Sequence, residues 1–239
     1  TEENHGYDLY RMTEKLGSEI TGLDNVIINA GNDINIKGST VASDGTVQLA
    51  AENNINIEND KNTLYTESKR EKNGTFSSYY RLETNYQEEA AASTIIGNNI
   101  ILDANNDINV RASNIIAVKD SFENTGGNIS MTAGNNVNIL ADTLDNSYSR
   151  KDQKSGFSTS FASGGGSFTA GVSYSQNSLE QQRNGTTVAV STIISEGNTV
   201  IDAGNRVRTE AMQANVGENL VIRGVNGVEL LDAQEVYNE

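Results

Sequence analysis

A short phrase recurs along the chain and constrains the fold more than any other feature of the sequence. AGNDINI begins at Ala30, and variants of it begin at Ala51 (AENNINI), Ala104 (ANNDINV), Ala133 (AGNNVNI) and Ala203 (AGNRVRT). Recurrence at this density is typical of repeat architectures, in which each unit buries its apolar face by stacking on its neighbours. The repeat therefore has to be placed before any local pattern is interpreted.

Apolar residues around each copy follow a fixed pattern. A pair spaced i and i+2 is followed after eight residues by a second such pair, and this alternation predicts short strands with one face inward. The six copies are Val26/Ile28 with Ile34/Ile36, Val47/Leu49 with Ile55/Ile57, Ile100/Leu102 with Ile108/Val110, Ile129/Met131 with Val137/Ile139, Thr199/Ile201 with Val207/Thr209, and Leu220/Ile222 with Val228/Leu230.

Successive copies lie 21 residues apart, as from Val26 to Val47 and from Thr199 to Leu220. This length holds three short strands and three turns, so the sequence predicts a β-solenoid with one coil per 21 residues. A longer gap after Ile100 predicts an inserted loop of eight residues within 118–127. About seven coils at ~4.8 Å each would form a rod of roughly 35 Å. The third strand is expected at apolar patches around Val41, Leu64, Ile115–Ala117 and Leu144.

The recurring phrase marks the corner between the first and second strands. Asparagine tolerates left-handed backbone angles and bonds to its own turn, and identical amides ~4.8 Å apart also bond along a stack. Small residues precede the corner, and the chain has no proline to remove an N–H from a neighbouring coil. We therefore expect a structural corner ladder formed by Asn32, Asn53, Asn106, Asn135, Asn205 and Asn226.

A longer period groups the coils in pairs. STII occurs at Ser93 and at Ser191, each time before a two-coil block, and GSEI at Gly17 is a weaker copy. The sequence thus predicts a leader or cap over residues 1–16 and a single β-helix over 17–239. The helix contains three repeat units, 17–59, 93–141 and 191–239, with inserts at 60–92 and 142–190. Both ends of this rod are expected to be exposed strand edges.

The two inserts have the pattern of hairpins. The first contains Asn73-Gly74 between runs of Tyr, Thr and Ser, which predicts a type I′ turn. In the second, apolar and hydroxyl residues alternate on both sides of Gly164-Gly165-Gly166, so that one face is apolar and the other carries hydroxyls. Their aromatic residues are candidate contacts with a partner or a membrane: Phe76, Tyr79, Phe157, Phe161, Phe168 and Tyr174.

Two arrangements of the inserts are open. Ile27, Ile101 and Val200 point outward from the first coil of each unit, so docked inserts would cover apolar residues where a solvated face is normally polar. Alternatively, the inserts stand free and enter the outer membrane of a target cell, because alternating apolar and hydroxyl faces suit a membrane strand. The first arm of about five residues is shorter than the ~9–11 residues that a spanning strand needs.

Charge and composition exclude several classes of function. The 239 residues carry a formal charge of −15, which repels a phosphate backbone and disfavours nucleic acid as a partner. There is no cysteine for a disulfide or a thiolate metal site, and no calcium-binding loop motif. His5 is the only histidine and lies in the leader, where we expect a solvated residue. We expect neither a metal nor another cofactor.

The AGNxINI coils, the STII blocks and the Ser/Gly-rich inserts resemble the haemagglutinin repeats of filamentous haemagglutinin-type exoproteins, including contact-dependent growth inhibition proteins of two-partner secretion. The resemblance implies a right-handed parallel β-helix, exported with an outer-membrane secretion partner and displayed at the bacterial cell surface. It also implies adhesion, or delivery of a C-terminal toxin to a neighbouring cell. The inserts would then contact a host or target-cell surface component: a receptor, a glycan or the outer membrane.

β-Helices also occur in carbohydrate-active enzymes, so a polysaccharide lyase or hydrolase is the alternative function. Such an enzyme needs carboxylates or a basic residue clustered on one outer strand face. The outward positions of the first and second strands group no acids in this sequence. Asp103 and Asp202 occupy equivalent places in two repeats, as structural repetition predicts. We therefore expect a non-catalytic segment.

Overall fold

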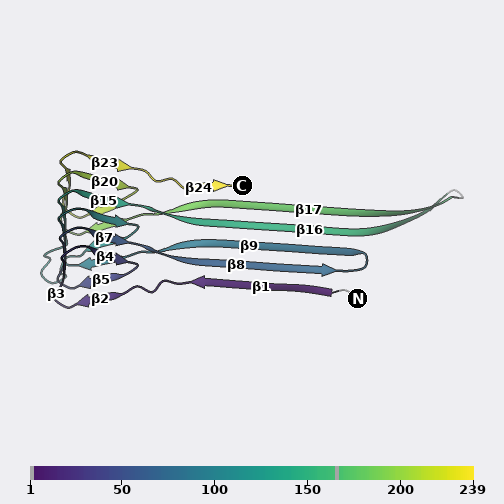
Figure 1. Ribbon diagram of the computed structural model, residues 1–239, viewed down its shortest axis with the longest axis horizontal. Helices are drawn as coiled ribbons and strands as arrows, with labels where there is room; N and C mark the ends of the chain where they lie inside the picture. The colour runs from purple at the N-terminus through teal and green to yellow at the C-terminus, as the bar shows by residue number, and fades with distance from the viewer. Residues whose placement is uncertain (1–2, 165–166) are drawn as a thin grey trace.

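The protein consists of two differently built parts. The computed structural model describes residues 3–164 and 167–239, which form strands and turns without helices. Figure 1 shows a short stack of coils at one end and a long sheet that projects from its side. The strands form four six-stranded sheets, of which three are parallel and one is antiparallel. The predicted all-β, parallel β-helical fold is confirmed.

Each coil contributes one strand to each of three parallel sheets. Sheet I contains β3 (Asn25–Ala30), β6 (Thr46–Ala51), β11 (Asn99–Ala104), β14 (Asn128–Ala133), β19 (Thr199–Ala203) and β22 (Leu220–Gly224). Sheet II contains β4 (Ile34–Lys37), β7 (Ile55–Glu58), β12 (Ile108–Arg111), β15 (Asn136–Leu140), β20 (Arg206–Glu210) and β23 (Val228–Leu231). Sheet III contains β2 (Glu19–Gly22), β5 (Thr40–Ser43), β10 (Thr94–Gly97), β13 (Asn114–Ala117), β18 (Thr192–Ser195) and β21 (Gln213–Val216).

The core runs along the inside of the coils and is aliphatic. Neighbouring strands pair in register, so that each inward residue stacks on its equivalent, as Ile100 does on Val47 and Ile129. Every buried apolar side chain in the described part is Val, Ile, Leu, Met or Ala. Each Val, Ile or Leu buried in this way contributes about 1.5–3 kcal/mol relative to an exposed one. Many equal small contributions therefore hold the coils together, as the low aromatic content predicts.

The STII segments are strands of sheet III. Ile95 and Ile193 fill its inward positions, and the preceding Ser93 and Ser191 are buried at the corner. Each serine Oγ donates to a backbone carbonyl of the preceding coil: Ser93 to Glu58 at 2.6 Å and Ser191 to Leu140 at 2.8 Å. Val41 and residues 115–117 lie in sheet III as expected, whereas the placement of Leu64 and Leu144 in the third strand is wrong. Those two residues lie in the hairpins, because the chain leaves the stack before it forms the next strand of sheet III.

The described residues form six coils rather than about seven, which corresponds to a height of about 29 Å at ~4.8 Å per coil. The difference arises because both chain ends lie outside the stack. The longer gap after Ile100 is a loop between β13 and β14, as predicted. The Asn98 side chain holds this loop against the coils by donating to the carbonyls of Val118 (3.0 Å) and Thr125 (2.8 Å).

The fourth sheet combines both inserts with both ends of the described chain. Its order is β1 (Glu3–Thr13), β8 (Asp60–Asn73), β9 (Ser77–Ala91), β16 (Asp142–Gly164), β17 (Ser167–Ala189) and β24 (Val236–Asn238), and we name it the projecting sheet. Within the segment 1–16, expected as a leader or cap, Glu3–Thr13 forms β1 and pairs with β8. The third repeat unit likewise leaves the coils after Leu231. Hairpin edges expose unpaired N–H and C=O groups; β1 pairs along most of the β8 edge, and β24 pairs with residues 184–186 of β17.

Both inserts are hairpins, but their turns differ from the expected form. Asn73 remains in β8 and pairs with Ser78, and the Gly74 N–H donates to the Ser77 carbonyl at 2.9 Å. The turn is therefore longer than a two-residue type I′ turn, and that prediction is wrong. In the second hairpin, Gly164 ends β16, whereas Gly165 and Gly166 lie outside the described residues.

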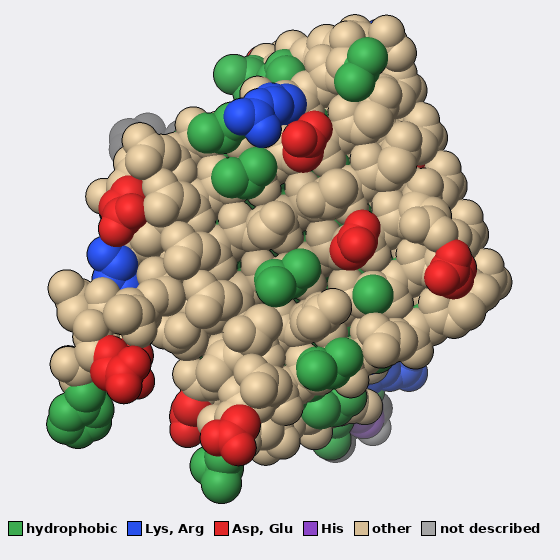
Figure 2. Space-filling view, turned by 90° about the vertical axis from the view of Figure 1, so that its left-hand side faces the viewer, with side chains coloured by type: hydrophobic (Ala, Val, Ile, Leu, Met, Phe, Trp, Pro, Cys, Tyr) green, Lys and Arg blue, Asp and Glu red, His purple; other side chains and the backbone are tan. Residues whose placement is uncertain are grey.

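The inserts do not dock on the outer face of sheet I. Ile27 is 60% exposed and Ile101 is 38% exposed. Both lie on sheet I, on the side of the coils that faces away from the projecting sheet (Figures 1 and 2). The docking hypothesis is therefore wrong. The physical reason is that β9 pairs with β16, so that the hairpins satisfy their edges by forming one sheet with each other.

The six corner asparagines stack at the turn between sheets I and II. Their backbone N–H groups donate to the asparagine carbonyl one coil below, with distances from 2.6 to 3.0 Å. Their side-chain amides donate mainly to the residue that follows the corner asparagine of the preceding coil: Asn53 to Asp33, Asn106 to Asn54, Asn135 to Asp107 and Asn205 to Asn136. A second ladder, which the sequence reasoning missed, runs along the outside of sheet II through Asn35, Asn56, Asn109 and Asn138, with each step at 2.8 Å.

Replacement of one corner amide should measure the worth of this ladder. We expect Asn135→Leu to lower the free energy of unfolding by about 1–3 kcal/mol, because Asp107 and Asn205 lose a hydrogen-bond partner in a partly buried site. Thermal unfolding followed by circular dichroism gives the value. Asn215→Leu, at an exposed position of β21, is the control. Equal stability of the two variants would rule out a stabilising corner ladder.

Candidate contact surface on the projecting sheet

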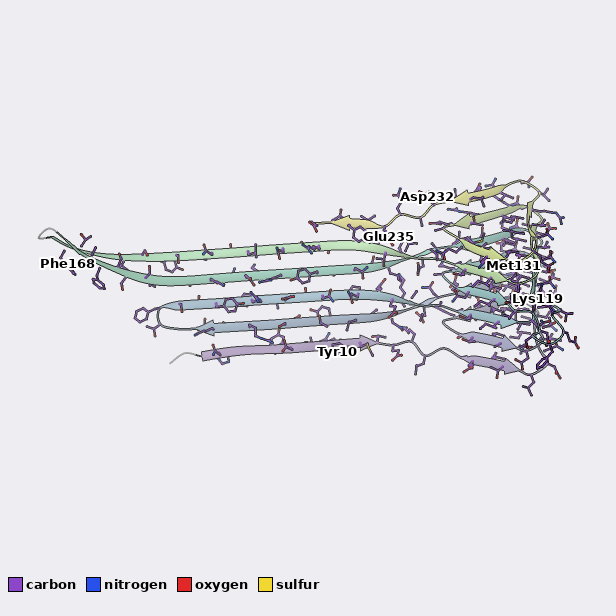
Figure 3. All side chains as sticks on the ribbon, turned by 180° about the vertical axis from the view of Figure 1, so that it is seen from behind. Tyr10, Lys119, Met131, Phe168, Asp232 and Glu235 are labelled. Atoms are coloured by element: carbon purple, nitrogen blue, oxygen red, sulfur yellow. The ribbon has the colours of Figure 1, made fainter. Side chains whose placement is uncertain are left out.

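Aromatic residues concentrate in the projecting sheet. All nine tyrosines of the chain lie in its strands, and four of the five phenylalanines lie in its hairpins. The long antiparallel strands of Figure 3 carry side chains on a single layer that extends away from the coils. Because the coils hold no tyrosine and the chain has no tryptophan, tyrosine fluorescence reports on the projecting sheet alone.

The outer end of the sheet is a two-stranded ribbon. Pairing between β9 and β16 stops at Gly156, whereas β16 and β17 continue to pair beyond it. In this ribbon Phe157 lies opposite Tyr174, with ring centroids 4.9 Å apart, and the Phe161 and Phe168 rings are 6.1 Å apart. The other face carries small and hydroxyl residues, Ser158, Ser160, Gly171 and Ser173 among them. The predicted separation of apolar and hydroxyl faces is present in the described part of the ribbon.

The apolar face of the ribbon is exposed. Phe157, Phe161, Phe168, Val172 and Tyr174 are between 55% and 74% exposed. Phe76, from the turn of the first hairpin, joins them: its carbonyl accepts the Phe157 N–H at 2.8 Å, and its side chain lines a shallow groove with Phe157 and Val172. We name these six residues the apolar tip. Exposed apolar patches are where proteins commonly contact other apolar surfaces, which makes the apolar tip the candidate contact surface.

Tyr79 does not belong to this cluster. It lies opposite Lys154, which places it on the face of the sheet that carries the hydroxyl residues in the ribbon. The charged groups of Arg81 and Lys154 lie 5.6 Å and 5.5 Å from its ring centroid, so cations occupy its surroundings. Of the six aromatic residues that the sequence singles out, the structure brings five together and separates Tyr79.

An ion-pair cluster joins the two hairpins on the same face as Tyr79. Asp152 of β16 accepts two hydrogen bonds from Arg81 of β9, at 2.8 and 3.2 Å, and further bonds from Arg150 at 2.8 and 3.2 Å. The hydrogen bonds from Arg81, and to a lesser extent those from Arg150, lower the pKa of Asp152 from its ordinary 3.8 to about 2. The carboxylate is nearly buried, so the cluster couples the first hairpin to the ribbon that carries the tip.

A second cluster lies where the hairpins leave the coils. The Lys61 ammonium pairs with Glu88 at 3.0 Å and Asp142 at 3.8 Å and donates to the Thr143 carbonyl at 2.6 Å. Burial would lower the pKa of Lys61, but Glu88 and Asp142 outweigh it and raise the pKa. Asn59, which is buried, donates to Asp142 at 3.0 Å. These contacts join residues of both hairpins at the base of the projecting sheet.

The described residues contain no group of three or more His, Asp or Glu side chains placed to hold a metal ion. Every carboxyl group with a shifted pKa in this part of the chain has a lowered one, and none is raised as a general acid requires. Within residues 3–164 and 167–239, no helix is long and apolar enough to cross a membrane.

Comparison with protein families decides the classification. The family model described as hemagglutinin repeat matches residues 7–79 and 73–227, which is most of the chain. The chain belongs to the hemagglutinin repeat family. This is a region of the filamentous haemagglutinin and contact-dependent inhibition type, as the resemblance of the motifs predicts. No solved structure matches the chain.

Three curated relatives carry the name CdiA. The chain is 29% identical over 212 residues to the 16S rRNA endonuclease CdiA of Enterobacter cloacae, covering 84% of this chain and 6% of that protein. It is 24% identical over 233 residues to the tRNA nuclease CdiA-2 of Burkholderia pseudomallei, covering 94% of this chain and 7% of that protein. It is 28% identical over 145 residues to the tRNA nuclease CdiA of Yersinia mollaretii, covering 54% of this chain and 5% of that protein. The hemagglutinin-repeat chain is thus a segment of a large exoprotein of this type and spans a small fraction of its relatives.

The strength of the Asp152 cluster should depend on pH. A lowered pKa stabilises the folded state above the ordinary pKa of 3.8, and this stabilisation is lost as the pH falls towards about 2. We expect Asp152→Asn to destabilise the projecting sheet by about 2 kcal/mol at pH 7 and by little at pH 2. Urea unfolding followed by tyrosine fluorescence measures both values. Asp103→Asn, at an exposed site on the coils, should have no effect, and a pH-independent difference for Asp152→Asn would contradict the assignment.

Proposed function

We propose that this chain is a non-catalytic segment of a secreted, cell-surface exoprotein in which the coils are a rigid support and the apolar tip contacts a target cell. The family and the three CdiA relatives support this reading. In such a parent protein, export would use an outer-membrane secretion partner. The segment would serve adhesion, or the presentation of a toxin domain to a neighbouring cell.

The apolar tip is the single observation that carries the contact role. Its aromatic residues are exposed although aromatic side chains normally bury their large apolar area. The ribbon that carries them has about eight residues per strand, or roughly 26 Å at 3.3 Å per residue. This is shorter than the ~9–11 residues of a spanning strand, so the ribbon would enter the ~30 Å apolar layer of a bilayer without crossing it. We therefore propose that the tip enters the outer membrane of the target cell and that the coils remain outside.

Membrane contact is tested with vesicles made from outer-membrane lipid. The double variant Phe161→Ser/Phe168→Ser should bind these vesicles at least tenfold more weakly, because burial of each ring contributes about 1.5–3 kcal/mol. Co-flotation with vesicles measures the bound fraction. Phe122→Ser is the matched control, since Phe122 is 97% exposed but lies in the loop between β13 and β14. An equal loss of vesicle binding in the double variant and in Phe122→Ser, or no loss in the double variant, would refute a tip-specific contact.

The alternative function, a carbohydrate-active enzyme, would have to use Asp103 and Asp202. They lie in one column of sheet I, with Thr132 between them, and Arg223 is 3.7 Å from the Asp202 carboxylate. Both aspartates lie on the outer face of sheet I, and Thr132 between them leaves no third acid in the column. Structural repetition explains the two aspartates without catalysis.

Incubation with polysaccharides tests the non-catalytic assignment. Polygalacturonate, glycosaminoglycans and mixed glycans should yield no product with the purified chain, as measured by reducing-end assay and mass spectrometry. Product that disappears with Asp103→Ala or Asp202→Ala, and not with Asp44→Ala, would establish the enzymatic alternative instead.

A further inference from the structure

The two faces of the projecting sheet differ in charge close to the point where the ribbon begins. In an antiparallel sheet, directly paired residues place their side chains on the same face, and neighbours along a strand alternate. We compare the faces over residues 68–72, 79–83, 150–154 and 177–181. The face that carries Tyr79 holds five cations and two acids: Arg70, Lys72, Arg81, Arg150 and Lys154 with Glu83 and Asp152. The opposite face holds two of each: Lys69 and Lys151 with Glu71 and Glu180. We name the first the cationic face.

Carboxylates neutralise only part of the cationic face. Arg81 and Arg150 share the single carboxylate of Asp152, each at 2.8 Å. Arg70 pairs with Asp8 of β1 at 2.7 Å. Neighbouring cations that outnumber their acids repel one another, so an anion bound among them would be favourable.

Lys154 is the cation of this face that no acid neutralises. It is exposed, and within residues 3–164 and 167–239 it forms no ion pair. Its ammonium group and the Arg81 guanidinium lie 5.5 Å and 5.6 Å from the centre of the Tyr79 ring. On its other side, Lys154 lies opposite Asn177 of β17. An ammonium group, a phenol hydroxyl and an amide can all donate hydrogen bonds, and charge-assisted donors of this kind bind phosphate oxygens.

The position of Lys154 along the sheet fits the headgroup layer of a membrane that the apolar tip enters. Lys154 precedes Gly156, where pairing with β9 ends and the ribbon begins, by two residues, or about 7 Å at 3.3 Å per residue. The polar layer on each side of the ~30 Å apolar core of a bilayer is about 5–7 Å thick. A lysine at this position would reach headgroup phosphates while its stem lies along apolar surface.

The ribbon continues the cationic face with hydroxyl groups. Ser158 and Ser173 are paired residues of this face, and their hydroxyl oxygens lie 2.6 Å apart. This side of the ribbon is therefore polar, whereas the other side carries the rings of the apolar tip. Headgroup contact and ring burial thus use different surfaces of the sheet, and separate variants can remove each of them.

We propose that the cationic face binds the phosphate groups of lipid headgroups and that Lys154 makes the principal contact. This inference rests on the proposed entry of the apolar tip into a target membrane. It adds the class of lipid that the segment prefers, namely lipids whose headgroup ends in a phosphate monoester. Such a group carries a charge of about −1.5 to −2 at neutral pH and three acceptor oxygens.

The net charge of −15 does not prevent this contact. Most of the excess acidic residues lie outside the strands of the projecting sheet. Lys154 is twelve residues beyond Asp142, where β16 begins, which corresponds to about 40 Å. Exposed charges more than ~8 Å apart are largely screened at physiological ionic strength. The potential at Lys154 is therefore determined by its neighbours on the cationic face rather than by the coils.

Co-flotation with vesicles at physiological ionic strength tests the site. Vesicles of phosphatidylcholine, with and without phosphatidic acid, share an apolar layer but differ in phosphate monoester. Wild-type protein should bind the vesicles with phosphatidic acid about tenfold more tightly. Lys154→Gln should reduce this preference about fivefold, which is the contribution of one basic residue near an anionic surface, and Lys154→Arg should retain it.

Lys151→Gln is the matched control. Lys151 is an exposed lysine of the same strand, three residues nearer the coils and on the opposite face, so its substitution changes the net charge equally. Its effect on the preference should stay below about twofold. Equal losses in Lys151→Gln and Lys154→Gln, or a wild type without a preference for phosphatidic acid, would overturn the proposal. Circular dichroism and tyrosine fluorescence establish that the variants are folded.

A soluble lipid separates this inference from the proposed membrane entry. Dihexanoyl phosphatidic acid, below the concentration at which it forms micelles, presents the same phosphate without a bilayer. By isothermal titration calorimetry it should bind wild type and Phe161→Ser/Phe168→Ser equally and Lys154→Gln about fivefold more weakly. Vesicle binding without a preference for phosphatidic acid would refute the phosphate site and leave membrane entry standing. Binding of the soluble lipid without vesicle binding would support the site and refute membrane entry. Displacement of the soluble lipid by inorganic phosphate at equal concentration would show that the free anion, and not a lipid headgroup, is the ligand.

Discussion

Hydrogen bonding between successive coils is the constraint on which the rest of the structure depends. Each strand of the β-helix pairs only with its equivalents one coil above and below, so residues at one repeat position share one environment. This requirement explains the stacked aliphatic columns, the small residues before the corner and the absence of proline. It also explains why amides recur on three lines of the surface: at the corner, outside sheet II, and at the start of sheet I, where Asn99, Asn128, Asn198 and Asn219 are linked. An asparagine both donates and accepts, so it can bond to an identical neighbour.

The projecting sheet follows from the same stacking. Both hairpins leave from the corner between sheets II and III, two coils apart, so the stack brings their edges side by side. Pairing of β9 with β16 then satisfies backbone groups that an isolated hairpin would leave to water. The Lys61 cluster adds charged contacts at the base of this sheet, and the Asp152 cluster adds them further out along β9 and β16. The β-helix thus determines the spacing of a second structure whose own sequence is not repetitive.

The coils could be predicted from the sequence because identical environments require similar residues at a constant spacing. The alternation of Val26/Ile28 and Ile34/Ile36 therefore identified sheets I and II and their corner. Sheet III was harder to predict from the sequence. In two coils a hairpin stands between the sheet II strand and the STII strand of sheet III, so the constant spacing is lost. The tip aromatics could be singled out by composition, but their clustering depends on pairing between hairpins that lie far apart in sequence, and Tyr79 differs from its neighbours only by the alternation of faces.

The ribbon extends beyond its neighbours because β16 and β17 are 23 residues long, whereas β9 has 15. Without a pairing partner, the outer residues of the ribbon bury their aromatic rings only against each other, so their apolar face stays in water. In many proteins, a charged side chain on such an exposed face prevents association with other apolar surfaces. The apolar tip instead carries none, while cations lie on the opposite face and nearer the coils. The apolar face of the ribbon is therefore left in contact with water, and its burial against another apolar surface would be favourable.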